Sequence, residues 1–350
     1  MPSVDASSKK ALITGISGQD AAYLAEMLLE DGYEVFGTYR PQSKRDFWRL
    51  SALGIRSHPR LRLLEFEACH LSACRDLFRA TEVSEVYNLA AQSSALASLD
   101  SPVETAQANG MSVLYLLEAL RLEMPETRFF QAGSADLFGQ PLVTPQTEDT
   151  SFHPGTPYGV AKLFAHWLTL NYREAYGIYA SNGIFFNHES PLRGMEFVTR
   201  KITHAIARIK FGLQDYLELG DLDARRDWGY AKDYARGMLS ALRAAQADTF
   251  VFATGRMNTV RDFVALSSQA AGFDLEWQKT TGGEIGVDRE SGKTLVRVNR
   301  DLYRAKDISH RVGNPEKARR LLGWEASISL AALCAMMVRA DEARVTECAR

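Results

Sequence analysis

A glycine turn between a short apolar strand and an amphipathic helix most constrains the fold of this chain. Residues 10–14 are a short apolar run, Gly15, Gly18 and Ala21 follow with G-x-x-G-x-x-G/A spacing, and residues 22–31 have helical periodicity. The first glycine permits a tight turn, and the second lets backbone N–H groups approach a pyrophosphate at the helix N-terminus. The turn predicts a phosphate-binding strand–helix unit; a plain connecting turn is the alternative.

Strands and helices continue to alternate along the first half of the chain. Further apolar strands are expected at residues 33–39, 61–66, 85–89 and 128–132, with helical stretches between them. This alternation has the spacing of parallel crossover units. We therefore expect an α/β protein whose first domain, residues 1–186, is a Rossmann doubly wound parallel sheet.

The pattern becomes irregular after residue 186. A basic helix at residues 199–210 and a glycine- and charge-rich loop at residues 282–293 indicate a smaller C-terminal α/β lobe over residues 187–340. Residues near 229–265 are expected to return to the first domain. The tail beyond Ala340 is charged and is expected to be frayed.

Composition excludes several classes of partner. The formal net charge of −2 gives no reason to expect nucleic acid or an anionic membrane. The chain has no apolar run of about 18 residues, so no membrane span is expected. The polar N-terminus does not resemble a signal peptide. The cysteines lack metal-ligand spacing, so we expect no metal and a reduced, cytoplasmic protein. They are Cys69, Cys74, Cys334 and Cys348.

Four residues are candidates for acid–base chemistry. Tyr158 and Lys162 are four apart, so on a helix they share one face. An ammonium beside a phenol favours the phenolate and lets the tyrosine move protons near neutral pH. Ser134 and Asp136 follow a strand end, where parallel sheets bind ligands. Ser134 can hydrogen-bond a substrate hydroxyl, and Asp136 is a candidate general base or, alternatively, a cap on the following turn.

The end of the second strand indicates which dinucleotide binds. An acidic residue there would bind the ribose of NAD, but this chain has Arg40. A guanidinium suits a 2′-phosphate and favours NADP, with a solvated surface arginine as the alternative. Small residues within 88–93, after the fourth strand, would let the backbone approach the dinucleotide.

Cationic side chains recur in the second lobe. They occur at Arg193, within residues 199–201 and 224–228, and at Arg304. Several arginines and lysines that converge on a concave site suit a diphosphate. Scattered surface salt bridges are the alternative for any one of them.

Together these strings resemble the GDP-mannose 4,6-dehydratase family, within the extended short-chain dehydrogenase/reductase group. The resemblance covers about residues 10–340. Its Asn-His-Glu-Ser-Pro string at residues 187–191 and its Arg-Asp-Trp string at residues 226–228 are much more specific than a glycine turn. The matching stretches are residues 14–20, 87–93, 158–162, 171–177, 186–191, 197–201, 226–229 and 322–324.

The resemblance implies a Rossmann lobe that carries recycled NADP and a smaller lobe that carries a GDP-sugar. Tyr158 would take the C4 hydroxyl proton while hydride passes from C4 to NADP⁺. Asp136 would remove the C5 proton that the C4 ketone acidifies, water would leave from C6, and hydride would return to C6. Ser134 would hydrogen-bond O4, and Lys162 would tune Tyr158 and hold the nicotinamide ribose. The product is a 4-keto-6-deoxy sugar, and the assembly is a homodimer or homotetramer.

The same matching implies two sets of contacts. The cofactor contacts are Gly15, Ser17, Gly18, Gln19, Asp20, Arg40, Glu67, Ala68, Leu89, Ala90, Ala91, Tyr158, Lys162 and His188. The substrate contacts are Ser93, Asn187, Arg193, Val198, Lys201, Arg226, Arg304 and Asp307.

The chain departs from the family pattern close to the expected chemistry. The family's Thr-Ser-Glu is Ser134-Ala135-Asp136 here, and its paired arginine after the second strand is Arg40-Pro41. Asp136 is one methylene shorter than glutamate, so its reach falls by about 1.5 Å.

We expect a dehydratase acting on GDP-mannose or a related GDP-hexose or GDP-heptose. Two alternatives stay open. One is a GDP-sugar 4-reductase or epimerase that keeps the tyrosine, lysine and serine but does not dehydrate. The other is a non-catalytic protein that binds NADP and a nucleotide sugar.

Overall fold

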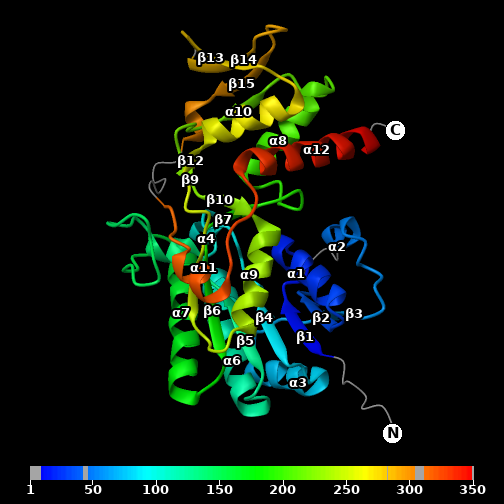
Figure 1. The fold of residues 1–350 in the computed structure, drawn as a ribbon, viewed down its shortest axis with the longest axis vertical. Helices are drawn as coiled ribbons and strands as arrows, with labels where there is room; N and C mark the ends of the chain where they lie inside the picture. Colours follow the sequence, from blue (N-terminus) through cyan, green and yellow to red (C-terminus); the bar gives the residue numbers. More distant parts are fainter. Residues whose placement is uncertain (1–8, 42–45, 282, 304–310, 349–350) are drawn as a thin grey trace. The chain divides into compact units, whose positions relative to one another are not determined.

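The computed structural model describes residues 9–41, 46–281, 283–303 and 311–348 (Figure 1). The chain divides into two compact units, each assembled from separate stretches of sequence. The first unit contains Met1–Phe186, Ala231–Phe252 and Asn314–Glu325. The second contains Asn187–Tyr230, Ala253–Gly313 and Ala326–Arg350.

A parallel sheet of seven strands is the centre of the first unit, in the order β11-β6-β5-β4-β1-β2-β3. The strands are β1 (Lys10–Thr14), β2 (Glu34–Tyr39), β3 (Leu61–Glu65), β4 (Glu85–Asn88), β5 (Arg128–Ala132), β6 (Ala180–Phe185) and β11 (Thr249–Phe252). The winding direction reverses between β1 and β4, and open α/β sheets bind ligands beyond the carboxyl ends of such strands. The expected doubly wound Rossmann sheet is confirmed.

Helices cover both faces of this sheet (Figure 1). On one face α3, α6 and α7 bury a shared apolar core that contains Leu12, Phe78 and Phe129. On the other face α1 contacts α9. The helices of this unit are α1 (Gln19–Glu30), α2 (Trp48–Ala52), α3 (Leu71–Thr81), α4 (Ala97–Asp100), α5 (Pro102–Ala106), the π-helix η1 (Gln107–Met111), α6 (Ser112–Glu123), the 3-10 helix η2 (Ala135–Phe138), α7 (Pro157–Tyr176), α9 (Ala231–Arg243) and α11 (Glu316–Leu322).

Helix α11 and the residues around it pack in the first unit, whereas the sequence places them in the second lobe. The indole of Trp324 donates to the carbonyl of Asp233 at 2.7 Å, and its ring lies edge-on to Phe252. The space exists because Gly237 of α9 has no side chain: a Cβ there would lie 2.5 Å from the Phe252 ring and 3.0 Å from the Trp324 indole nitrogen. This aromatic contact is long-range in sequence, so periodicity does not reveal it.

The second unit combines three helices with small sheets. α8, α10 and α12 pack together around Ile206, Phe263 and Met337. The helices are α8 (Val198–Lys210), α10 (Val260–Ala271), α12 (Leu330–Cys348) and the short η3 (Arg300–Leu302). The strands are β7 (Asn187–Glu189), β8 (Leu217–Leu219), β9 (Arg225–Arg226), β10 (Trp228–Tyr230), β12 (Asn258–Thr259), β13 (Leu275–Thr280), β14 (Gly283–Asp288) and β15 (Thr294–Val298). Within the described ranges no helix has the length and apolar character needed to cross a membrane.

Two local expectations for this unit are wrong. Residues 283–288, expected in a loop, form β14 and pair antiparallel with β13 and β15. The frayed tail is instead the last part of α12, in which Asp341 is fully buried and Val345 is 6% exposed. The charges beyond Ala340 suggested a solvated tail because their partners, including Arg200, are distant in the sequence.

Candidate active site

The glycine turn brings two backbone segments into contact at the carboxyl end of β1. Gly15 has φ +73°, and a Cβ on it would lie 2.8 Å from the Cα of Ala90. The Gly18 N–H donates to the Gly15 carbonyl at 3.0 Å, and α1 begins at the next residue. Gly18 is the N-cap residue of α1 and, without a side chain, makes no side-chain cap. The turn therefore offers N–H groups and close backbone approach.

A chain of buried polar side chains fixes the loop after β4. The Thr14 hydroxyl donates to Asn88 Oδ1 at 2.6 Å and accepts from the N–H groups of Leu89 and Ala90, both at 3.0 Å. The Asn88 amide in turn donates to Gln131 Oε1 at 2.8 Å. These three polar residues position the predicted cofactor loop, and sequence reasoning missed them. Their signal was a polar residue at or near the end of each apolar strand.

The next part of that loop is held by the π-helix η1. Asn109, 1% exposed, accepts from the Gln92 N–H at 2.8 Å and donates to the Gln92 carbonyl at 2.9 Å. Its neighbour Gly110 packs against α7, where a Cβ would lie 3.0 Å from the Phe164 ring. The π-helix thus links the segment that contains Ser93 to the helix of Tyr158. The sequence had no signal for Asn109.

Tyr158 and Lys162 lie in the first turns of α7. The helix begins where Thr156 accepts from the Gly159 N–H at 3.1 Å, with Pro157 at its first position. Both side chains are buried, at 7% and 4% exposure, and the Lys162 ammonium lies 6.0 Å from the centre of the Tyr158 ring. The predicted shared face is present.

The Lys162 ammonium is anchored to the end of β5. It donates to the carbonyl of Ala132 at 2.8 Å. Burial lowers the pKa of Lys162 to about 8, and the nearby Asp20 carboxylate opposes this shift by favouring the charged form. Asp20 stands in the first turn of α1. The glycine turn and the lysine are therefore electrostatically linked.

Ser134 and Asp136 occupy the turn between β5 and α7. Ser134 caps η2: its hydroxyl oxygen accepts from the Asp136 N–H at 3.2 Å and lies 3.4 Å from Asp136 Oδ2. The Asp136 backbone lies against α7, because a Cβ on Gly159 would be 2.8 Å from the Asp136 carbonyl oxygen. The cap is thus Ser134 rather than Asp136. Ala135 between them is buried.

Three further predicted cofactor residues follow β2 and β3 at the same edge of the sheet. Arg40 and Glu67 are exposed, and Ala68 is half-buried. Nearby, the Arg49 guanidinium donates to the Ser17 carbonyl at 2.8 Å and lies over the Trp48 ring at 4.7 Å. Arg49 therefore supports the glycine turn, a role that sequence reasoning missed.

The remaining predicted contacts belong to the second unit. Asn187 and His188 are half-buried on β7, and β7 pairs with β10, which follows Arg226. Val198 and Lys201 are exposed at the start of α8. The other predicted contacts, Arg304 and Asp307, lie outside the described residues.

Arg193 and Asp227 both have structural partners in this unit. The Arg193 guanidinium lies 3.0 Å from Glu189 and stacks on the Phe197 ring at 3.4 Å. Asp227 accepts from the N–H groups of Thr254 and Gly255 at 2.9 and 3.0 Å. Burial raises the pKa of Asp227 to about 6, and these hydrogen bonds oppose the shift. Asp227 thus anchors the strand pair that carries Arg226.

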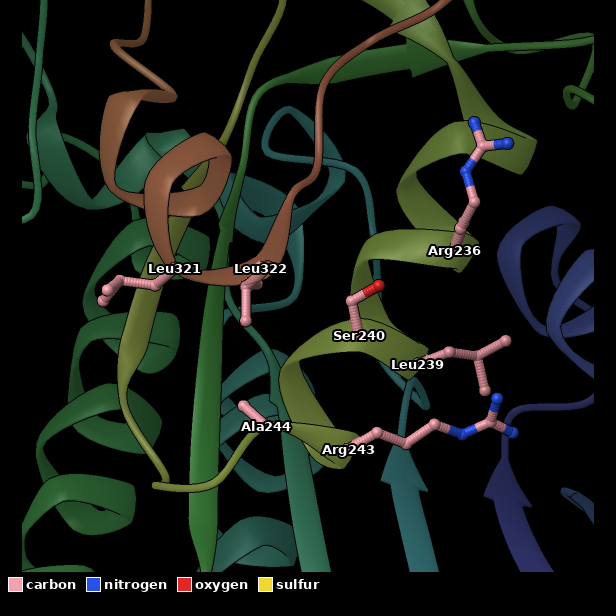
Figure 2. Close-up of a pocket in the computed structure, with 7 residues that line it drawn as sticks. All are labelled: Arg236, Leu239, Ser240, Arg243, Ala244, Leu321 and Leu322. Atoms are coloured by element: carbon pink, nitrogen blue, oxygen red, sulfur yellow. The ribbon is translucent and has the colours of Figure 1, made fainter.

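A separate concavity of about 360 Å³ lies on α9 and α11. Figure 2 shows its lining along α9, with the α11 leucines beside it. Its two arginines already have carboxylate partners: Arg236 pairs with Asp233, and Arg243 lies 2.8 Å from Asp31. None of the predicted site residues lines it. The lining residues are Arg236, Leu239, Ser240, Arg243, Ala244, Leu321 and Leu322.

The doubly wound sheet, the glycine turn and the buried tyrosine–lysine pair define an extended short-chain dehydrogenase/reductase. Solved structures share the fold. UDP-glucose 4-epimerase from Thermotoga maritima has a TM-score of 0.80 at 23% identity and covers 97% of this chain and 99% of its own. The dTDP-glucose 4,6-dehydratase from Bacillus anthracis, in complex with NAD, has a TM-score of 0.80 at 16% identity, with 97% and 98% covered.

Sequence relatives define the class further. The family model for GDP-mannose 4,6 dehydratase matches residues 12–337. GDP-mannose 4,6-dehydratase from Yersinia enterocolitica is 44% identical over 348 residues, covering 95% of this chain and 94% of the relative. The human enzyme is 40% identical over 339 residues, with 95% and 91% covered. The chain belongs to the GDP-mannose 4,6-dehydratase family. This confirms the predicted enzyme class, a nicotinamide-dependent hydro-lyase acting on GDP-mannose.

Proposed function

We propose that this chain converts GDP-mannose, or a closely related GDP-hexose or GDP-heptose, to the 4-keto-6-deoxy sugar with recycled NADP. We assign the chemistry to Tyr158, Lys162, Ser134 and Asp136. The observation that carries the proposal is the packing of η2 against the start of α7. That packing joins a serine and a carboxylate to a buried tyrosine–lysine pair within one short segment of the first unit.

The first unit fits a dinucleotide. Gly15 forms a cradle that a Cβ would fill, and the start of α1 presents N–H groups of the kind that bind a pyrophosphate. A dinucleotide held there would supply the hydride acceptor for sugar C4 and the hydride donor for C6. Lys162 would hold the nicotinamide ribose.

The four residues divide the proton transfers and their support among them. Tyr158, as phenolate, takes the proton from the C4 hydroxyl while Ser134 donates a hydrogen bond to O4. The C4 carbonyl that results makes C5–H acidic, and Asp136 removes that proton. The protonated Asp136 gives that proton to the C6 hydroxyl, which leaves as water. Return of hydride to C6 requires a proton at C5, and Tyr158 gives back the proton that it took from O4, which restores the phenolate. Lys162 keeps the ionised tyrosine stable through its charge.

The second unit is proposed as the GDP-sugar unit. Asn187, Lys201 and Arg226 would hold the diphosphate, because cations and amides satisfy phosphate oxygens. Lys201 is exposed and Arg226 half-buried, so both can reach a ligand. Val198 would contact the same substrate, and Arg193 would support it from its ion pair with Glu189.

The decisive experiment is the redox balance with GDP-mannose. A dehydratase should release a 4-keto-6-deoxy product with only catalytic NADP⁺ and show no net change in nicotinamide absorbance. Stoichiometric use of NADPH would identify a reductase instead. Bound GDP-mannose that yields no product at high enzyme concentration would contradict the dehydratase proposal.

The choice of NADP over NAD depends on Arg40. Replacement by alanine removes the guanidinium that would pair with the 2′-phosphate, and we expect NADP binding about tenfold weaker with NAD binding unchanged. Dissociation constants for both dinucleotides measure this. Arg62→Ala is the control, since Arg62 is another exposed cation and lies on β3. Equal weakening of both dinucleotides would contradict the assignment.

The pH dependence of kcat should reflect Lys162. Its pKa is lowered to about 8, so the ammonium that supports the Tyr158 phenolate is lost as pH rises through 8. We expect kcat to fall on the alkaline side with a limb near pH 8. Lys162→Arg keeps its charge at this pH, so the variant should be slower but lack that limb. An identical limb in both proteins would argue against Lys162 as its source.

We further propose a homodimer or homotetramer. Val160, Phe164 and Trp167 follow each other at i, i+4 and i+7 on α7 and are 55%, 42% and 56% exposed. A second copy of this chain is the partner we assign to that apolar face. Sedimentation velocity of the wild type tests this, and a monomer at micromolar concentration would refute it.

We also propose a cytoplasmic location. It is supported by the free thiols of Cys69, Cys74 and Cys334, which are typical of a reducing compartment. Cell fractionation tests that point.

A further inference from the structure

A buried carboxylate on the last helix of the second unit organises a network of cations. Asp341 is fully buried, and Arg200 of α8 pairs with it at 2.5 and 3.0 Å. Its Oδ2 also accepts from the Thr203 hydroxyl at 2.7 Å, and its Oδ1 accepts from Arg344 at 3.1 Å. Both carboxylate oxygens are thus satisfied, which is the condition under which a buried charge is tolerated.

The two arginines extend this network to the loop that follows β7. Arg200 Nη1 donates to the carbonyls of Pro191 and Arg193, both at 3.1 Å. Arg344 Nη2 donates to the same Pro191 carbonyl at 2.8 Å. Asp341 aligns the guanidiniums, and the guanidiniums hold the peptides. Fixing the planes of two peptides in so short a loop fixes the path of its backbone.

A second carboxylate, on the last residue of β7, holds the same loop from its N-terminal side. Glu189 is 2% exposed, accepts from the Thr199 hydroxyl at 2.6 Å and pairs with Arg193 at 3.0 Å. The hydrogen bond from Thr199 to Glu189 therefore joins the start of the segment between Asn187 and Lys201 to its end. The proposed function assigns diphosphate contacts to both Asn187 and Lys201.

We propose that Asp341 and Arg344 are positioning residues for the GDP-sugar site. They do not touch the ligand; they set the backbone of the loop at residues 190–193, and so the placement of the flanking contacts. This inference rests on the proposed function of the second unit. It assigns a role in substrate affinity to a helix end that carries no motif of the family.

The test compares nucleotide affinities in folded variants of the full chain. Arg344→Ala removes one of the two hydrogen bonds to the Pro191 carbonyl and leaves the ion pair between Arg200 and Asp341 in place. The fold should survive, because the Arg344 side chain is 30% exposed. We expect GDP to bind about tenfold more weakly by calorimetry, and NADP⁺ to bind unchanged. Arg344→Lys, which can donate to the same carbonyl, should recover part of the GDP affinity.

The matched control is Glu342→Gln. Glu342 is the neighbouring carboxylate on α12 and joins α8 through Lys210 at 2.8 Å, without contacting the loop. It should leave affinity for both nucleotides within about twofold of wild type. GDP affinity in Arg344→Ala within the same limit would overturn the proposal. So would an equal loss of GDP and NADP⁺ binding, which indicates general destabilisation.

Failure of the proposed function would be visible separately in the wild type. A wild-type protein that binds GDP but makes no 4-keto-6-deoxy product would refute the reaction and leave the positioning role to be judged on GDP affinity. A wild-type protein that does not bind GDP would overturn both.

Discussion

Tyr158→Phe is expected to lower kcat about 1,000-fold, the size of a lost general acid–base group. The variant removes only the hydroxyl that takes the O4 proton. The ring is 7% exposed and keeps its packing, so the fold and NADP⁺ affinity should be retained. Rapid-quench measurement of 4-keto-6-deoxy product from GDP-mannose checks the rate, and calorimetry checks the cofactor.

Tyr172→Phe is the control for that experiment. Tyr172 lies on the same helix, is buried, and donates its hydroxyl to Glu118 at 2.9 Å. Loss of that hydrogen bond should lower thermal stability slightly and leave kcat unchanged. A Tyr158→Phe variant with at least a tenth of wild-type kcat would remove Tyr158 as the base.

Asp136→Asn is expected to stop dehydration, with product formation falling about 1,000-fold, because an amide does not accept the C5 proton. Oxidation at C4 precedes that step and should survive. The variant should therefore show a single burst of nicotinamide reduction without product. Exchange of C5–H with deuterium, followed by mass spectrometry, separates the two steps. Normal exchange in the variant would rule out Asp136 as the base.

The converse change, Asp136→Glu, tests the shorter carboxylate. The added methylene extends the reach by about 1.5 Å, and a base misplaced by that distance can lose about 100-fold in rate. If the aspartate is short of C5, the glutamate variant should react faster. Asp149→Glu lengthens an exposed carboxylate in the same unit and is the control. A glutamate variant slower than wild type would show that the turn at Ser134 already places Asp136 correctly.

Local pattern predicted the parts of the site that depend on short-range geometry. The turn at Gly15 needs only a few neighbouring residues, and the shared face of Tyr158 and Lys162 follows from helical spacing. Helix boundaries were predicted less accurately: α1 begins at Gln19, whereas the apolar pattern begins three residues later. The positive φ and the close approach of Ala90 explain why glycine is required at position 15.

Contacts between distant segments were invisible to such reasoning. Thr14 meets Asn88 across 74 residues, Asn109 holds Gln92 across 17, and Asp341 meets Arg200 across 141. Each partner has an ordinary local setting, so neither periodicity nor motif marks it. For the same reason the sequence analysis assigned α11 to the second lobe and predicted a frayed end for a helix that is buried there.

The sequence by itself determined that this chain has a doubly wound sheet, a dinucleotide turn and a tyrosine–lysine pair, because helix and strand periodicities and tight turns are local properties. Only the tertiary structure decided how those parts are supported. It showed Lys162 bonded to Ala132, Ser134 capping the turn of Asp136, and Asp341 clamping a loop through two arginines. The physical reason is that hydrogen bonds and burial join residues by distance in space, which sequence order does not specify.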